Sequence, residues 1–591
     1  MLDVAVRPAP AKKAAHMPSS KSIRMPSSRL MAAVPVYAWL LLLVVAPNAL
    51  LLAYSCWTSG DLGLDRTFTL NNYITVLTSS TNTRLIIRTV GIALGVALFA
   101  TLLAFPMAFI VSQKLKRGRM VAVMLVVVPL WVSLLIRVFA WKIILGDTGV
   151  LNTGLMALGV IDRPIGFLLY TRFTVFLTLT TVAVPFVFVA AYTSLERVPK
   201  SVLEASSDLG ASSVKRFTTI IWPLARQGVA IGFTLAFVLA VGDYLSPSLV
   251  GGLSGTMVGS VIVSQFGVAN NWPLGAALAI ILLAVVTVVA AAIARAGRAT
   301  GVLEGDTGAG ISTDAVPGSQ LRRRFTDVLS YTYLAFAYGL LYLPLLAIAV
   351  FSLNDSRVQT LPIKGLSFTW YRQLLDSPEL IAAFQRSVIV AVGAVVISLL
   401  FGIVFALIFA YRTPRGAGVL QGALTLPFLL PGVILGLSLA IVFRTIGMPF
   451  GLTTVILGHA TFITPIVMAV LLARLRQMDP SLVHAALDLG ATPVRALAGI
   501  VLPQLRTAFV GAALLGFTLS FDEVLVTFFL TGEQATLPVY IYNQLRFGFT
   551  PTINALFTCI VVASVALLLM ALKFITGRNS NKAPTEALAL G

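Results

Sequence analysis

The sequence predicts an all-α, polytopic membrane protein with about twelve transmembrane helices arranged as two parallel six-helix repeats. Three observations lead to this prediction. Of the 591 residues, 58% are hydrophobic and only 11% are charged, which is a membrane composition rather than that of a soluble domain of this size. Apolar runs long enough to span a bilayer occur twelve times. A polar stretch in the first half recurs in the second half without a gap.

Each predicted span holds the roughly 20 apolar residues that cross the hydrocarbon core of a bilayer. The first six are expected near residues 33–56, 86–112, 121–145, 173–195, 228–251 and 273–296. The second six are expected near residues 328–353, 386–411, 419–443, 451–473, 507–531 and 553–575. With the N-terminus in the cytoplasm, the inside segments hold 29 of the 42 Lys and Arg residues. This positive-inside asymmetry predicts that both termini are cytoplasmic.

The spans divide the chain into five parts. Residues 1–30 are rich in Ser, Pro, Ala and basic residues and lack the apolar core of a signal peptide, so they are expected to form a cytoplasmic tail. The first half covers 31–296 and the second covers 326–576. Residues 297–325 between them, rich in Gly, Thr and Ser, are the expected cytoplasmic linker. Residues 577–591 form a second short cytoplasmic tail.

The repeated stretch lies between spans in both halves. Residues 204–226 and 484–506 align at an offset of 280, with nine of 23 positions identical. Each copy is polar enough to lie in water although apolar spans flank it. We therefore expect a compact hook at the membrane surface, made of a short helix, a Gly turn and a second helix that ends at Pro. The alternative is an amphipathic connector that binds no partner.

The hooks resemble the EAA loop of ABC importer permeases, which reads Glu-Ala-Ala, three residues, Gly, nine residues, then Ile-x-Leu-Pro. In that family the loop inserts into a groove of a cytoplasmic ATPase subunit. The resemblance implies coupling loops near 197–226 and 475–506. The coupling residues that it implies are Glu204, Ala205, Asp208, Gly210 and Pro223, and His484, Ala485, Asp488, Gly490 and Pro503. His484 departs from the pattern, as do Ser206 and Trp222, because the family has Glu, Ala and Leu at these places.

The spans narrow the resemblance to spermidine/putrescine-type importers. Similar to the first permease subunit of these systems are residues 129–152, the stretch GDYLSPSLVGG at 242–252, and residues 271–275. Similar to the second permease subunit are residues 431–436, 520–523 and 537–556. The chain thus resembles two permease subunits fused head to tail, with the type I ABC importer permease fold.

The resemblance also implies partners and a location. They are a cytoplasmic ABC ATPase dimer that holds ATP and Mg, an extracytoplasmic substrate-binding protein, membrane lipid, and the bacterial inner membrane. No cofactor or metal is expected on this chain, which has only two cysteines and no G-x-x-x-x-G-K-[ST] or H-E-x-x-H motif. No catalytic residue is predicted. Although the net charge is +20, no basic stripe interleaved with aromatics favours nucleic-acid binding.

Three of the 22 acidic residues fall within predicted spans. Asp243 lies in the fifth span, and Asp522 and Glu523 lie in the eleventh; the offset of 280 places Asp243 opposite Glu523. Carboxylates in hydrocarbon are costly unless they face a polar cavity or a counter-charge. We therefore expect them to line a path for a cationic amine, with Asp243 as the first ligand. The other side chains expected along this path are Tyr244, Arg137 and Trp131.

A second interpretation of the acids stays open. Asp243 and Glu523 would pair with Arg137 or Lys142 and only hold the helices together. His459, in the tenth span, is expected to be a packed and hydrogen-bonded residue rather than a ligand.

The sequence predicts the permease subunit of an ATP-driven importer for a small cationic solute, with a polyamine such as spermidine or putrescine as the expected solute. The same fold and loops also fit an importer of ferric iron, an opine or another amine-containing solute. A secondary transporter with two six-helix repeats fits the hydropathy but gives no reason for two hooks. A membrane-embedded enzyme lacks any catalytic cluster.

Overall fold

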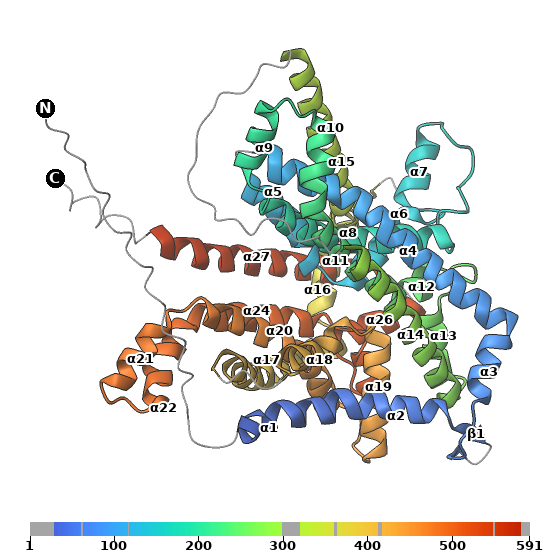
Figure 1. Cartoon of the computed structure of the whole chain (residues 1–591). Helices are drawn as coiled ribbons and strands as arrows, with labels where there is room; N and C mark the ends of the chain where they lie inside the picture. Colours follow the sequence, from blue (N-terminus) through green and yellow to red (C-terminus); the bar gives the residue numbers. More distant parts are fainter. Residues whose placement is uncertain are drawn as a thin grey trace, which may run out of the picture.

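The computed structural model describes residues 29–297 and 320–580, with gaps at 61–62, 116–117, 358, 360–362, 412–415 and 548–549. Nearly all of the predicted N-terminal tail, most of the predicted linker and the end of the predicted C-terminal tail lie outside the described residues. The described chain is helical, as predicted, except for loops, one β-bridge and a two-stranded hairpin (Figure 1). In the hairpin, β1 (Thr58–Gly60) pairs antiparallel with β2 (Gly63–Asp65).

The first half contains helices up to α14. In chain order they are α1 (Arg29–Leu40), the π-turn η1 (Leu41–Val45), α2 (Ala46–Ser55), α3 (Asn71–Thr78), α4 (Ser80–Phe109), the π-turn η2 (Ile110–Lys114), α5 (Arg119–Val127), the 3-10 turn η3 (Val128–Trp131), α6 (Leu134–Leu145), α7 (Val150–Ala157), α8 (Arg172–Glu196), α9 (Lys200–Asp208), α10 (Ser213–Arg216), the π-turn η4 (Phe217–Ile221), α11 (Trp222–Gly242), α12 (Leu245–Val250), α13 (Val258–Phe266) and α14 (Trp272–Gly297).

The second half follows the same order, without counterparts of the β1–β2 hairpin and of α7 in its described residues. Its elements are α15 (Gln320–Ser352), α16 (Thr369–Leu375), α17 (Pro378–Tyr411), α18 (Ala417–Leu429), α19 (Gly432–Thr445), α20 (Leu452–Arg476), α21 (Pro480–Asp488), α22 (Pro493–Ala496), the π-turn η5 (Leu497–Val501), α23 (Leu502–Gln504), α24 (Arg506–Phe521), α25 (Thr527–Leu530), α26 (Leu537–Phe547) and α27 (Thr552–Ser580).

Eight helices in the described ranges are long and apolar enough to cross a membrane, and three bent pairs would raise that number to 11. The polytopic prediction is therefore confirmed, but two of the predicted spans, 121–145 and 419–443, are bent. The pair Arg119–Leu130 and Leu134–Ala157 bends by 89°, and the pair Ala417–Phe428 and Gly432–Thr445 bends by 97°. In the second of these, Pro431 forces the residue before it into an extended conformation, which ends the helix. The third pair, at the second hook, bends by 65°.

The spans that carry the acids also differ from the prediction. Hydropathy predicts continuous helices at 228–251 and 507–531, but α11 ends at Gly242 and α24 ends at Phe521. The chain then runs through a short break and turns into a small helix, α12 or α25. In the first half the reason is local, because the Asp243 side chain accepts hydrogen bonds from backbone amides at the start of α12.

The two halves exchange their first spans. Helices α1 and α2 pack against α17 and α19 of the second half, where Trp39 meets Phe401 at 4.6 Å between ring centroids (Figure 1). Conversely, α15 packs against α4, α5 and α6 of the first half. Three tyrosines of α15 donate hydrogen bonds to first-half carbonyl oxygens at 2.7 to 2.9 Å: Tyr333, Tyr338 and Tyr342. Each half therefore covers the other.

A matched contact near the start of α4 and α17 shows how alike the halves are. Arg88 donates to the carbonyl oxygen of Ser254 at 3.0 Å, and Arg386 donates to that of Ala535 at 3.0 Å. Each guanidinium thus fastens a long helix to the loop that follows the small helix of its own half.

Candidate functional site

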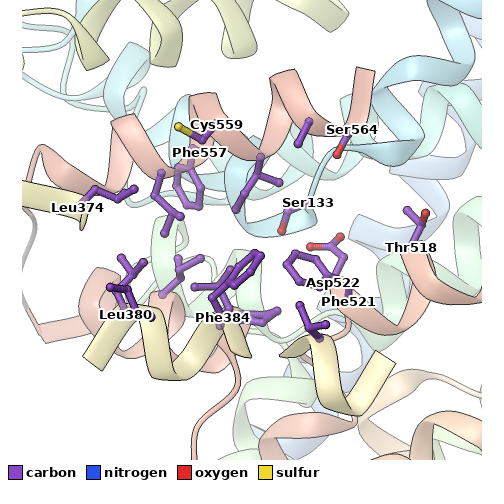
Figure 2. Close-up of a pocket in the computed structure, with 18 of the residues that line it drawn as sticks. Ser133, Leu374, Leu380, Phe384, Thr518, Phe521, Asp522, Phe557, Cys559 and Ser564 are labelled. Atoms are coloured by element: carbon purple, nitrogen blue, oxygen red, sulfur yellow. The ribbon is translucent and has the colours of Figure 1, made fainter. Parts of the chain in front are cut away.

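Four helix breaks meet where the two halves face each other. Two are the breaks that carry the acids, and two are the bends before α6 and α19, at Ser133 and Pro431. The Ser133 side chain and the Leu134 amide of the first half approach the Asp522 carboxylate of the second (Figure 2). Reciprocally, a Cβ on Gly242 of the first half would lie 2.6 Å from the Cβ of Pro431. Each bend therefore contacts the acid-bearing break of the opposite half.

Asp243 uses its carboxylate within its own chain. Its side chain is 1% exposed. The Oδ1 atom accepts from the amides of Leu245 at 2.8 Å and Ser246 at 3.3 Å, and Oδ2 accepts from the Ser246 hydroxyl. No ion pair with Asp243 is present in the part of the chain that the structure describes. Asp243 therefore serves as the cap of α12, and the pairing with Arg137 or Lys142 is not what the structure shows for it. The ammonium of Lys142 instead lies 5.9 Å from the ring centroid of Tyr170.

Tyr244 of the first half packs against aromatic rings that follow Glu523 in the second half. The Tyr244 ring packs at 5.7 to 6.4 Å from three aromatic rings of the second half: Phe528, Tyr542 and Phe529. Within the described ranges its buried hydroxyl has no hydrogen-bond partner, and it interacts electrostatically with Tyr542 and Glu523. Glu523 is half-buried, and its Oε1 accepts from the Val526 amide at 2.9 Å. An aromatic cluster thus closes the space between the acid-bearing breaks.

Asp522 is the acid that faces Arg137. Arg137 on α6 is 7% exposed and interacts electrostatically with Asp522. Its Nε and Nη1 atoms are buried and have no hydrogen-bond partner among the described residues. The predicted arginine counter-charge therefore acts on Asp522 electrostatically, although no ion pair joins the two side chains in the part of the chain that the structure describes. Trp131 ends η3, and its side chain lies outside the described residues.

A cavity of about 540 Å³ opens beside Asp522 (Figure 2). Its walls come mainly from α16, α17, α24, α26 and α27 and are largely apolar, with aromatic rings from Phe384, Phe521 and Phe557. Among the described residues, Asp522 is its only acidic lining residue, and none of its lining residues is basic. Figure 2 shows the Asp522 carboxylate and the Ser133 hydroxyl side by side at one part of the cavity wall. Of the predicted path residues whose side chains the structure describes, only Asp522 lines this cavity.

The two hooks have the predicted short helix and Gly turn. In the first, α9 is followed by Gly210 with φ +77° and then by α10; in the second, α21 is followed by Gly490 with φ +86° and then by α22. In the second hook α23 ends at Gln504, one residue after Pro503, and the chain then bends by 65°. In the first hook the prediction that the second helix ends at Pro is wrong. The helix continues past Pro223 into α11, because the π-turn η4 widens the backbone and the Trp222 amide bonds to the carbonyl oxygen of Phe217, five residues back. This arrangement avoids the clash that Pro causes in a regular α-helix.

The hooks present the same surface to solvent. The exposed residues predicted for coupling are Glu204, Ala205, Asp208 and Gly210 in the first hook and His484, Ala485, Asp488 and Gly490 in the second. Pro223 and Pro503 are half-buried at the base of each hook. Sequence reasoning missed two apolar pairs: Leu209 and Val214 are 87% and 73% exposed, and Leu489 and Val494 are 88% and 74% exposed. The sequence offered one signal for them, because both positions are identical in the two copies of the hook.

The inside of each hook is built differently. In the first hook Arg216 donates to the hydroxyls of Ser207 and Ser213, which ties α9 to α10. The matching positions of the second hook are apolar, and Ala496 is 2% exposed. Its first helix has instead a side-chain cap, since Asp479 accepts from the Ser481 amide at 2.9 Å. This bond lowers the pKa of the Asp479 carboxyl below its usual value.

Comparisons with known proteins match the chain twice over. The family model described as "Binding-protein-dependent transport system inner membrane component" matches residues 101–298 and 398–578. The spermidine/putrescine transport system permease protein PotB of Escherichia coli (strain K12) is 34% identical over 266 residues, which are 45% of this chain and 96% of PotB. The putrescine transport system permease protein PotI of the same strain is 36% identical over 251 residues, 40% of this chain and 89% of PotI.

Among solved structures, a crystal structure of a bacterial alginate ABC transporter in complex with an alginate pentasaccharide-bound periplasmic protein matches with a TM-score of 0.39 and 16% sequence identity. The match covers 46% of this chain and 93% of that chain.

Proposed function

Because the chain belongs to the family of binding-protein-dependent transport system inner membrane components, we propose that it unites the two permease halves of an ATP-driven importer for polyamines such as spermidine and putrescine. The family model matches once in each half, and PotB and PotI each correspond to less than half of this chain. The chain is therefore a multi-pass transport permease of the inner membrane and not itself an enzyme. The names of both relatives support a polyamine as the solute.

The observation that carries the solute proposal is the position of Asp522 in an apolar cavity. A carboxylate in a low-dielectric wall attracts an ammonium group strongly. Methylene groups gain about 0.8 kcal/mol each when they leave water for an apolar surface. An aliphatic amine fits both the carboxylate and the apolar wall of the cavity, because its ammonium group meets Asp522 and its methylene groups leave water. A compact, strongly hydrated Fe³⁺ ion uses only the acid, and an opine brings carboxylates that Asp522 repels.

The hooks support a cytoplasmic ATPase dimer as the partner. Leu209 and Val214, with their equivalents Leu489 and Val494, are large apolar side chains that stay exposed in both halves. Exposed apolar pairs at equivalent places are typical of interaction sites. ATP and Mg are assigned to that dimer, and the substrate-binding protein is assigned to the opposite side of the membrane. Single cysteines placed in 197–226 and 474–506 should label only from the cytoplasm, and labelling from outside would contradict this orientation.

A direct mechanical route joins each hook to the acids. The first hook continues through η4 and α11 to Gly242, which precedes Asp243. The second continues through η5, α23 and α24 to Phe521, which precedes Asp522. We propose that alternating access uses this route. Closure of the ATPase dimer draws the two hooks together, and α11 and α24 transmit this motion to the acid-bearing breaks at their C-terminal ends. The path then opens outward to receive the amine from its binding protein.

The proposal is tested by reconstituting the chain with its ATPase and binding protein in proteoliposomes. Uptake of a panel of solutes is measured with and without ATP: putrescine, spermidine, a ferric chelate and an opine. We expect ATP-dependent uptake of the amines alone. Amine uptake driven by an ion gradient without ATP would identify a secondary transporter, and uptake of the ferric chelate or the opine instead would overturn the solute assignment.

A further inference from the structure

His459 bridges the break that carries Asp522 and Glu523. The imidazole projects from α20 and is 1% exposed. Its Nδ1 atom lies 2.7 Å from the hydroxyl of Ser520, in the last turn of α24. Its Nε2 atom lies 2.7 Å from the hydroxyl of Thr527, the first residue of α25. One buried ring thus holds both ends of the break.

The hydrogen bonds around this ring have a defined direction. The Thr527 hydroxyl donates its single proton to the backbone carbonyl oxygen of Glu523 at 2.7 Å. Thr527 therefore accepts from His459, which places the ring proton on Nε2. Nδ1 then accepts from the Ser520 hydroxyl. The chain of bonds runs from Ser520 through the imidazole and Thr527 to the backbone of Glu523.

The first half has no such bridge. At the offset of 280, the positions of His459, Ser520 and Thr527 are occupied by Leu179, Ala240 and Pro247. None of these side chains has a hydrogen-bonding group. The first-half break is held instead by Asp243 itself, through both carboxylate oxygens. In the second half Glu523 makes the equivalent bond, to the Val526 amide at 2.9 Å, and the histidine adds a bridge between the two ends of the break.

We propose that His459 is a positioning residue for the solute path: it fixes the α24–α25 break so that Asp522 faces the cavity. This inference rests on the proposed function for its transport consequences, but the positioning itself is a property of the permease alone. The ring acts through Ser520 and Thr527 and does not line the cavity beside Asp522.

The first experiment needs no transport. Amide hydrogen exchange is measured in the purified full-length permease, in lipid nanodiscs, for peptides that cover residues 521–531. His459→Asn keeps an acceptor for Ser520 but does not reach Thr527, and we expect about tenfold faster exchange in that segment. His459→Gln places an amide donor near Thr527 and should exchange at a rate closer to that of the unmodified chain.

The control removes another buried hydrogen bond from the same helix. Thr464 on α20 donates to Ser398 at 3.2 Å, and both side chains are fully buried. Thr464→Val should leave exchange at residues 521–531 unchanged. Unaltered exchange in both His459 variants, or an equal increase in Thr464→Val, would overturn the proposal.

The second experiment uses the assembled importer. His459→Asn should raise the putrescine concentration that gives half-maximal uptake by about tenfold, while ATP hydrolysis stimulated by the binding protein stays within about twofold of the original rate. A general structural defect would instead lower both the rate of putrescine uptake and the rate of ATP hydrolysis. If the unmodified chain takes up no amine, the proposed function fails and the exchange experiment still decides the role of His459. Altered exchange with unchanged uptake would refute a role in the solute path.

Discussion

At the scale of single residues, the sequence identifies the three intramembrane acids but not their different duties. Asp243 and Glu523 are equivalent by alignment, so both were expected in the path, with Asp243 first. In the structure each of them caps its own break: Asp243 accepts from the amides of Leu245 and Ser246, and Glu523 accepts from the Val526 amide. The acid at the cavity wall is Asp522, which Ser133 reaches from the opposite half. No pattern within one sequence reveals a contact between breaks that lie hundreds of residues apart.

We therefore expect Asp522→Asn to lower ATP-driven putrescine uptake at least about tenfold, because the amide keeps the shape and removes the charge that holds the ammonium. Asp243→Asn is the matched control. An asparagine oxygen still accepts from the amides of Leu245 and Ser246, so most uptake should remain. Uptake by both variants is compared at equal amounts of assembled complex.

Two outcomes would contradict this assignment. Equal losses from Asp522→Asn and Asp243→Asn would return Asp243 to the path. Restoration of uptake by combining Asp522→Asn with Arg137→Gln would show that Asp522 only balances the arginine and does not bind solute.

At the scale of elements, hydropathy and the duplication predict the helices, the two hooks and their Gly turns. They do not predict the breaks, because a hydropathy window averages composition and is blind to a carboxylate that caps a new helix. They also miss the continuation through Pro223, because a π-turn depends on backbone hydrogen bonding rather than on the residue type alone.

The Gly turns lead to a prediction about coupling. Gly210, Gly490 and Gly511 all have open space where a Cβ would lie, but only the first two have positive φ. Valine at Gly210 or Gly490 should therefore strain the backbone and uncouple ATP hydrolysis from uptake, because a β-branched residue is a genuine outlier at positive φ. Gly511→Val, in the middle of α24, is the control and should stay coupled. Full coupling in Gly210→Val and Gly490→Val would show that the hooks tolerate another turn geometry.

The first helices of the two hooks also differ at one exposed position. Glu204 and His484 occupy equivalent, solvent-exposed places, but only the glutamate is an anion. We expect Glu204→Ala to weaken assembly with the ATPase more than His484→Ala does, because a carboxylate can meet a basic residue of the partner. Co-purification of the ATPase with each variant at rising salt measures the effect. Equal losses of co-purified ATPase from the two substitutions would contradict the expected difference between the hooks.

At the scale of the whole molecule, the two halves are alike in architecture and unlike at their centre. Ser133 contacts Asp522, and in the equivalent contact Pro431 approaches Gly242. The positions correspond at offsets of 298 and 280. The fold therefore builds the same junction twice, but only one junction carries an acid. Because only the Ser133–Asp522 junction carries a charge, it is suited to bind one ammonium group of the solute at a time.

The exchange of first spans leads to the last prediction. Trp39 and its neighbours complete the core of the second half, and α15 completes the first half through Tyr333 and Tyr338. Cutting the chain within the predicted linker at 297–325 removes neither set of contacts. The two fragments, expressed together, should therefore co-purify and transport amines, as expected if each half corresponds to a separate permease such as PotB or PotI. Each fragment expressed alone leaves an apolar surface uncovered and should be degraded or aggregate. Co-expressed fragments that fail to associate would show that the linker, rather than the exchanged helices, holds the halves together.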